Sequence, residues 1–359
     1  EGDWAISGAL SQRYVDVMGR ARTAISGLRI HAYAAAHAFP GVETRAASPF
    51  KYDGRRLVTP LYEAEFDDCG YIASLIERAT GRQYAAAMPL GTLLFGENVP
   101  DQYENWEISP SEGMKLQPVR ALLSREVISD GAVEWRVRSV YALSKRSTAT
   151  VDTVFHAADP AVTYDIKLDW HDKRALVKIA FDANIKSDFV RNEIQFGHMN
   201  RPTTRNTSLD SAKFEVVNHR WSDLSDARGG MALLNDCKYG MSAEGGMMTL
   251  TLMHGGCRPD PRGDEGVHEM KCAILPHSAP FSTEAVIAPA YKFNMPLIAS
   301  RTAAAMEPLF SLEGEHVICE TVKRAEDVEN TYVLRLYECE GVPARCEVSL
   351  HDAVKGVER

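Results

Sequence analysis

Strict alternation of apolar and polar side chains is the feature of this sequence that most limits its fold. In AVTYDIKLDW (161–170), every second residue from Val162 to Trp170 is apolar, and the residues between them are polar or charged. Successive side chains of a β-strand point to opposite faces, so this pattern predicts an antiparallel strand with one packed and one wet face. The same rhythm returns in VEWRVRSV (133–140), ALVKIAF (175–181), MTLTLM (248–253) and TYVLRLYE (331–338). Many short strands between Gly, Pro and Asp turns indicate a mainly β protein built from antiparallel β-sandwiches.

The length of the chain, 359 residues, exceeds what one compact core usually holds, so about two or three domains are expected. Breaks rich in turn residues divide the strand-rich part into three units. We predict a small β-sandwich over residues 40–115, a large one over 116–285 and a small C-terminal one over 286–359. The last unit is entered through the segment APAYKFNMP.

The first 39 residues follow a different rhythm. Apolar side chains between Leu10 and Ile25 recur at spacings of three and four residues, which predicts an amphipathic helix of about four turns. The chain opens with EGDWAIS, without an initiator Met or a signal peptide. We therefore expect residues 1–39 to be a helical remnant and linker, and the chain to be part of a longer protein. A processed whole protein is the alternative.

Charge and composition argue against several kinds of partner. The net charge is −9 and no Lys/Arg-rich block is present, so we expect no nucleic-acid partner. No apolar run approaches the roughly 20 residues that cross a bilayer, so we expect no membrane partner. The seven cysteines are scattered and form no CxxC pair, which favours reduced thiols in a cytoplasmic protein. The sequence leaves the oligomeric state open, a homo-oligomer included.

No catalytic or cofactor motif stands out. The sequence lacks GxxxxGK[ST], GxGxxG, GxSxG and HExxH, each of which has a defined chemical role. No His-x-Asp pair stands beside other plausible metal ligands, so scattered surface or core histidines are favoured over ligands. The 49 Asp and Glu residues could include the carboxylate pair of a retaining glycosidase, whose carboxyl groups lie about 5–5.5 Å apart. The sequence alone does not select that pair.

Four stretches are denser in polar and aromatic residues than sandwich packing requires: PDQYENWEI (100–108), RPTTRNTSLD (201–210), FEVVNHRWSDLSD (214–226) and MALLNDCKYG (231–240). Aromatic rings beside amide and carboxyl groups suit saccharides, because sugar C–H faces stack on rings and hydroxyls take paired hydrogen bonds. The competing interpretation, favoured for each residue taken singly, is structural. Trp221 and His219 would then plug the core, and Asp223 and Asp226 would cap turns.

Taken together, these stretches resemble the C-terminal half of a glycoside hydrolase family 38 α-mannosidase. The resemblance is densest over residues 193–240 and continues through RPDPRGDEGVHEMKCAILPH (258–277) and EHVICETVKRAEDVENTYVLRLYE (315–338), so it covers essentially the whole chain. It implies the end of the family's helical middle domain followed by β-domains, the largest a supersandwich like that of galactose mutarotase. The sequence departs from the family pattern at Thr204, Leu209 and Gly230, where His, Trp and an aromatic residue are expected.

The resemblance also implies where the chemistry lies. Complete members hydrolyse terminal α-linked mannose with retention, using an aspartate nucleophile and a zinc ion, both in an N-terminal α/β-barrel. This chain is therefore expected to carry no catalytic residue and to bind no zinc itself. Its expected partners are its own N-terminal catalytic barrel and α-mannoside oligosaccharides. The alternative function is an independent carbohydrate-binding or assembly module, and a mutarotase-like epimerase, suggested by fold analogy alone, is a weaker third alternative.

The turn in MALLNDCKYG receives a role from the same resemblance. The family's β-domains pack against the barrel, so we expect a barrel-facing turn that shapes a mannoside subsite or holds the domain interface. The candidate residues are Asn235, Asp236, Lys238 and Tyr239, with His219 and Trp221 nearby. Cys237 is expected to be a small buried filler. A sandwich edge whose polar groups merely satisfy one another is the equally weighted alternative.

Overall fold

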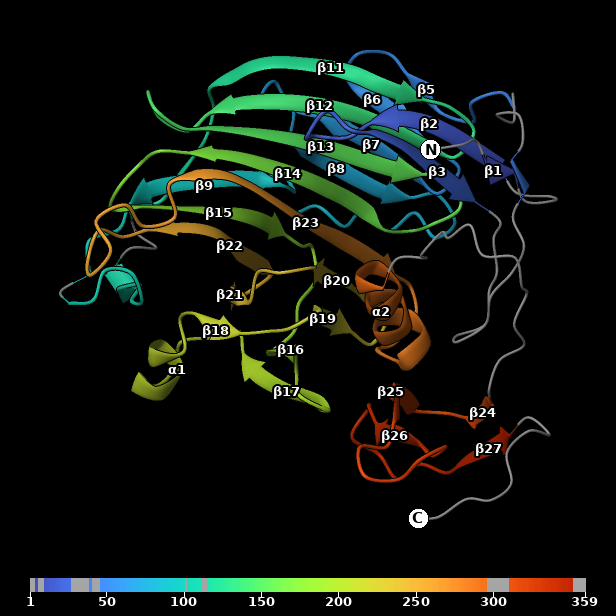
Figure 1. The fold of residues 1–359 in the computed structure, drawn as a ribbon. Helices are drawn as coiled ribbons and strands as arrows, with labels where there is room; N and C mark the ends of the chain where they lie inside the picture. Colours follow the sequence, from blue (N-terminus) through green and yellow to red (C-terminus); the bar gives the residue numbers. More distant parts are fainter. Residues whose placement is uncertain are drawn as a thin grey trace.

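The computed structural model describes residues 4–5, 10–26, 39–40, 46–100, 102–111, 115–295 and 310–350. This part of the chain is mainly β, with antiparallel sheets and a few short helices (Figure 1). The predicted fold class is confirmed. No helix among these residues combines the length and apolar character needed to span a membrane.

The largest sheet in the described part of the chain has nine strands. In spatial order they are β11 (Leu122–Asp130), β12 (Glu134–Ala142), β13 (Thr148–His156), β14 (Val162–Trp170), β23 (Gly266–His277), β20 (Gly229–Asn235), β19 (Trp221–Asp226), β16 (Phe189–Ile194) and β17 (Gly197–Pro202). The apolar residues of β14 are at most 2% exposed. The alternation in AVTYDIKLDW therefore marks the buried face of a central strand.

Two smaller sheets contribute to the core of this large sheet. The first has six strands: β10 (Gln117–Pro118), β9 (Thr92–Glu97), β15 (Ala175–Asp182), β22 (Met247–Gly255), β21 (Gly240–Glu244) and β18 (Val216–Val217). The second has four: β5 (Lys51–Tyr52), β6 (Arg56–Val58), β7 (Tyr62–Phe66) and β8 (Ile72–Glu77). Phe66 of β7, Trp135 of β12 and Phe181 of β15 belong to one hydrophobic core. The predicted domain boundary at residue 115 cuts through this arrangement, because β9 pairs with β15.

The amphipathic helix predicted between Leu10 and Ile25 is wrong. The segment forms an antiparallel hairpin of β2 (Leu10–Val15) and β3 (Ala21–Ser26). Its turn is closed by Asp16, whose carboxylate accepts hydrogen bonds from the backbone N–H groups of Met18 and Arg20, both at 2.9 Å. Gly19 adopts a φ of 80°, a conformation that glycine reaches without steric cost. A short strand pair, β1 (Trp4–Ala5) with β4 (Phe39–Pro40), accompanies the hairpin.

The hairpin covers part of the outer face of the nine-stranded sheet, which the alternation predicted to be wet. The Tyr14 ring lies 4.2 Å from the guanidinium of Arg136. Arg136 is 3% exposed and bonds to Glu134, Asp152 and Asp165 at 3.0, 3.1 and 2.6 Å. Burial raises the pKa of Tyr14 to about 12. A buried charge network therefore lies beneath the hairpin, and each of its charges is paired, as buried charges require.

The C-terminal segments pack on the other end of the nine-stranded sheet. A π-helical turn, η2 (Thr283–Ile287), leads into α2 (Ala288–Asn294), so the predicted entry segment APAYKFNMP is largely helical. Two two-stranded sheets follow. One pairs β24 (Phe310–Gly314) with β27 (Cys346–Leu350), and the other is a hairpin of β25 (Val317–Arg324) and β26 (Tyr332–Glu338). A second core, which contains Trp221, Ile287 and Cys339, joins β19, η2 and this C-terminal unit. One further helix, α1 (Ser208–Ala212), follows β17.

Candidate functional site

Four candidate residues come from the segment MALLNDCKYG. Asn235 is the last residue of β20, and Asp236, Lys238 and Tyr239 lie where the chain crosses from one sheet to the other. Residues 236–239 connect β20 of the nine-stranded sheet to β21 of the six-stranded sheet, and residues 218–220 connect β18 to β19 in the opposite sense. The Asn218 N–H donates to the Tyr239 carbonyl, and the Asn235 N–H donates to the Arg220 carbonyl, both at 3.0 Å. These two crossover turns therefore lie side by side.

Asn235 holds the two crossover turns together. Its side chain is fully buried. The side-chain Oδ1 accepts from the Lys238 N–H at 2.8 Å, and the Nδ2 donates to the carbonyl of His219. Its own carbonyl accepts from Asn294 of α2 at 3.0 Å. Asn235 is thus a buried, satisfied structural residue that fixes the path of the neighbours that reach the surface.

The other residues of the turn face outward. The Asp236 carboxylate accepts from the Lys271 N–H at 3.0 Å. Tyr239 is 53% exposed, and its ring centroid lies 5.5 Å from that of half-buried His219. Lys238 is half-buried. Cys237, on the turn after β20, is exposed, so the expectation of a buried filler is wrong.

Trp221 lies apart from this surface. It is 1% exposed, and its ring packs in the second core against Phe281 and His198, with centroids 5.2 and 5.9 Å away. Its Nε1 is buried and has no hydrogen-bond partner among the described residues. A ring enclosed in this way cannot stack on a sugar in solution. Trp221 therefore fills the second core, with its Nε1 left without a partner among the described residues.

Arg220, between His219 and Trp221 in the sequence, was not among the residues that the sequence singled out. Its Nε and Nη2 donate to Oε1 of Glu193 at 2.9 and 2.7 Å, and its guanidinium lies 3.8 Å from the ring centroid of Tyr291 in α2. Burial alone would lower the pKa of Arg220, but the bonds to Glu193 outweigh it and the pKa is raised. The bare dipeptide His-Arg gives no sign of this, because Glu193 lies on a different strand.

A second exposed group of aromatic residues lies in the segment PDQYENWEI. Tyr103 and Trp106 are 57% and 70% exposed, with ring centroids 5.6 Å apart. Glu104 anchors the segment by accepting from Arg174 Nη2 at 2.9 Å and from the Cys257 N–H at 3.1 Å. The bond from Arg174 lowers the pKa of Glu104 to about 2. The segment therefore presents two rings to solvent from an anchored backbone.

Comparison with known proteins identifies the family. Residues 57–262 match the model for the glycosyl hydrolases family 38 C-terminal domain, and residues 316–359 match the model for that family's C-terminal beta sandwich domain. The chain belongs to glycoside hydrolase family 38. Both matches are to C-terminal domains, so the chain is a C-terminal region of a family 38 protein.

Family 38 relatives support this assignment along most of the chain. Alpha-mannosidase 2C1 of Homo sapiens is 34% identical over 299 residues, which cover 81% of this chain and 29% of the human protein. Alpha-mannosidase G of Dictyostelium discoideum is 33% identical over 286 residues, or 76% of this chain and 26% of that protein. The chain thus spans less than a third of these relatives. A crystal structure of an alpha-mannosidase from Enterococcus faecalis V583 shares the fold, with a TM-score of 0.73 at 11% identity over 87% of this chain and 40% of that one.

Proposed function

We propose that this chain is the C-terminal, non-catalytic part of a retaining, zinc-dependent α-mannosidase that removes terminal α-linked mannose from oligosaccharides. Its β-sandwiches pack on the enzyme's N-terminal catalytic barrel, and the crossover turns help to wall the substrate channel. The observation that carries the proposal is the 34% identity over 299 residues to human alpha-mannosidase 2C1.

The surface of the crossover turns supports a role in packing. Val217 and Tyr239 are 56% and 53% exposed, and they adjoin because Val217 pairs with Gly240. Asp236, which lies in the same turn as Tyr239, is also exposed. A catalytic domain seated here would remove this apolar surface from water, at a gain of roughly 25 cal/mol per Å², while the charged side chains stay at the rim of the contact.

The zinc ion belongs, in this proposal, to the barrel. Zinc in proteins is held by three or four Cys, His, Asp or Glu ligands. The described residues contain no group of three or more such side chains that could hold a metal ion. We propose that the barrel supplies the zinc ligands and that the β-sandwiches of this chain support and enclose the barrel.

The proposal is tested by comparing two proteins on an aryl α-mannoside in the presence of zinc: the full-length gene product and this chain alone. We expect turnover by the full-length product and none by the chain alone. Robust turnover by the chain alone would overturn the division of labour.

A point variant tests the place of the crossover turns. In the full-length product, Tyr239→Ala is expected to lower kcat/KM by about tenfold, as loss of about 1.4 kcal/mol of transition-state stabilisation would. Tyr332→Ala is the matched control, since Tyr332 is 55% exposed in the C-terminal unit and should leave kcat/KM unchanged. Equal kinetics for the two variants would remove the crossover turns from the substrate channel.

One observation favours the second candidate function, a carbohydrate-binding module. Tyr103 and Trp106 present adjacent rings to solvent from an anchored loop, and exposed aromatic rings suit the C–H faces of sugars. Calorimetric titration of α-mannobiose into this chain tests it. Millimolar or tighter binding that Trp106→Ala abolishes would favour the module, and binding unchanged in that variant would exclude these rings.

We also propose that the protein works in the cytoplasm. The seven cysteines are scattered along the sequence and form no CxxC pair, as expected for reduced thiols, which are typical of reducing compartments. Fractionation of cells that express the full-length protein tests this proposal, and recovery from a secretory fraction would contradict it.

A further inference from the structure

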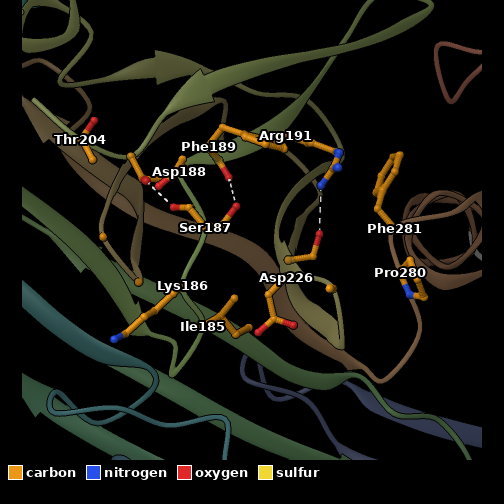
Figure 2. Close-up of a pocket in the computed structure, with 15 residues that line it drawn as sticks. Ile185, Lys186, Ser187, Asp188, Phe189, Arg191, Thr204, Asp226, Pro280 and Phe281 are labelled. Carbon is orange, nitrogen blue, oxygen red and sulfur yellow. Dashed lines mark hydrogen bonds between the residues drawn. The ribbon is translucent and has the colours of Figure 1, made fainter. Parts of the chain in front are cut away.

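An open pocket of about 890 Å³ lies at the opposite end of β19 from the crossover turns (Figure 2). β19 begins at Trp221, beside those turns, and ends at Asp226, which lines the pocket. Five separate segments meet there: 185–191, 203–204, 225–227, 245–246 and 280–281. The volume falls within the range of small-molecule sites, about 300–1,000 Å³.

Arg191 is the central polar group of the pocket. Its guanidinium lies between the rings of Phe189 and Phe281, 4.8 Å from each centroid. Its Nη1 donates to Oγ of Ser225 at 3.0 Å, and Figure 2 shows the side chain reaching across toward Phe281. The Nε and Nη2 atoms of Arg191 donate no hydrogen bond to any described residue. Neither atom is among the buried polar atoms that lack a partner, so both are accessible to solvent. Arg191 therefore keeps donors available to a molecule in the pocket.

A buried network fixes Arg191 in this position. Asp223 is fully buried; it lies 3.5 Å from Arg191 Nη1 and accepts from Ser225 Oγ at 2.7 Å. It also accepts from Nε2 of His277 at 2.9 Å, and the other ring nitrogen of His277 lies 2.7 Å from the carbonyl of Ala279. A guanidinium held by a buried carboxylate is preorganised for binding, because little side-chain freedom remains to be lost.

Gly230 shows that the chain makes room for this network. A Cβ at this position would lie 2.5 Å from the Leu224 carbonyl oxygen and 2.8 Å from Nε2 of His277. An aromatic residue, expected here from the family pattern, would displace His277 from Asp223. The bond between His277 and Asp223 therefore depends on the glycine at position 230, where the sequence departs from the family pattern.

The charges of the pocket wall balance. Two cations, Lys186 and Arg191, and two carboxylates, Asp188 and Asp226, line the pocket. Asp226 is already paired with Arg82 at 2.9 Å, whereas the exposed carboxylate of Asp188 has no side-chain partner among the described residues. A wall of both signs disfavours an anionic ligand, because the carboxylates would repel it. Free donors, a free acceptor and ring surface together suit a neutral polyol, whose hydroxyls both donate and accept.

We propose that this pocket is a saccharide-binding site, in which Arg191 donates to neighbouring hydroxyls of the sugar and Asp188 accepts from one. Phe189 and Phe281 supply the apolar contact. That the sugar is a mannoside rests on the proposed function, whereas binding of a neutral saccharide rests on the pocket lining alone.

The test titrates methyl α-mannoside, α-mannobiose and maltose into this chain by calorimetry. We expect Arg191→Met to weaken binding by about tenfold or more, since hydrogen bonds donated by a charged group are stronger than those between neutral groups. The matched control is Arg55→Met, because Arg55 is 71% exposed on its side chain and lies outside the pocket; it should bind as the unaltered chain does.

A second variant guards against a folding artefact. Ala227 is exposed at the pocket rim, so Ala227→Trp should fill the pocket without touching Asp223 or His277, and it too should weaken binding. Unchanged binding in either pocket variant, or no saccharide binding at all, would overturn the site. Binding of maltose but not of the mannosides would support a saccharide site and contradict its assignment to mannosides. The proposed function would then still be tested separately by the hydrolysis assay.

Discussion

The side-chain amide of Asn235 illustrates how one residue shapes the candidate site. The sequence places Asn235 in a polar cluster and suggests a surface role, but the residue is fully buried. Its two side-chain bonds, to Lys238 and His219, join turns that are 16 residues apart in the chain. The exposed position of Tyr239 depends on this buried neighbour.

Replacing Asn235 should destabilise the protein. Asn235→Ala leaves the Lys238 N–H and the His219 carbonyl without their partner, and an unsatisfied buried group costs about 1–3 kcal/mol. The measurement is the free energy of unfolding from urea denaturation. Asn206→Ala is the control, because Asn206 is exposed and its side-chain amide donates to the neighbouring Thr204 hydroxyl at 3.1 Å; it should change the free energy of unfolding by less than about 0.5 kcal/mol. Equal effects would contradict the structural role of Asn235.

His171 makes stability depend on pH in a defined direction. Its Nδ1 lies 3.2 Å from Glu265 and its Nε2 lies 2.8 Å from Asp169. Hydrogen bonds to Glu265 and then Asp169 raise the pKa of His171 above its ordinary 6.5. The bond to His171 in turn lowers the pKa of Glu265 below its ordinary 4.5. A raised histidine pKa stabilises the fold below 6.5, and a lowered carboxyl pKa stabilises it above 4.5.

The His171 contribution should therefore be largest between pH 4.5 and 6.5. It should decline as pH rises through the raised pKa of His171, and as pH falls through the lowered pKa of Glu265. Unfolding of the unaltered chain and of His171→Gln, followed from pH 4 to 9, measures the difference. Glu265→Gln should reduce this difference, while a gap between the two proteins that is flat across the range would refute the pairing.

At the scale of elements, the hairpin of β2 and β3 shows why a spacing pattern misled. Side chains at three- and four-residue intervals predicted a helix, but Asp16 and Gly19 close a turn in the middle of the segment. The hairpin is then fixed from outside. The Gln12 side chain bonds to Ser129 at 2.7 Å and to the backbone of residues 133 and 134 at 2.9–3.0 Å. A partner more than 100 residues away leaves no local signature.

The contact between Gln12 and Gly131 offers a test of this docking. A Cβ at Gly131 would overlap the amide of Gln12, so Gly131→Ala should expel that side chain and speed hydrogen exchange over residues 10–26. Gln12→Ala should do the same. Because both variants remove one contact, the double variant should cost less stability than the sum of the two single ones. Additive costs would show that Gln12 and Gly131 act independently.

The sequence predicts a strand well where apolar residues occupy one face of the strand and polar residues the other. The apolar residues of β14 occupy every second position and are all at most 2% exposed. β19 and β20 resist such reasoning because nearly all their residues are buried on both faces, so the pattern does not say which core Trp221 enters. The pocket around Arg191 is lined by five segments between residues 185 and 281. Their spacing in the sequence does not indicate that they lie close together in the fold.

Across the whole molecule, the candidate site is linked to the C-terminal unit. Arg220, beside the crossover turns, packs on Tyr291 of α2, and the Tyr291 hydroxyl lies 3.0 Å from that of Tyr337 in β26. Nearby, the Thr283 hydroxyl donates to Glu340 at 2.6 Å, and His316 Nδ1 lies 2.9 Å from the same carboxylate. Two sets of contacts therefore hold residues 310–350 to the large sandwich.

Glu340→Ala should loosen the C-terminal unit without unfolding the sandwich. The substitution leaves the Thr283 N–H and hydroxyl without their shared acceptor and removes the charge opposite His316, at a local cost of about 1–3 kcal/mol. Hydrogen exchange should quicken over β25 and β26 and stay slow over β14, because β14 belongs to the other core. Glu347→Ala, at an exposed position of β27, should leave both rates unchanged. If exchange over β14 quickened equally, the two cores would unfold as one unit, and the C-terminal strand pairs could not be regarded as separately docked.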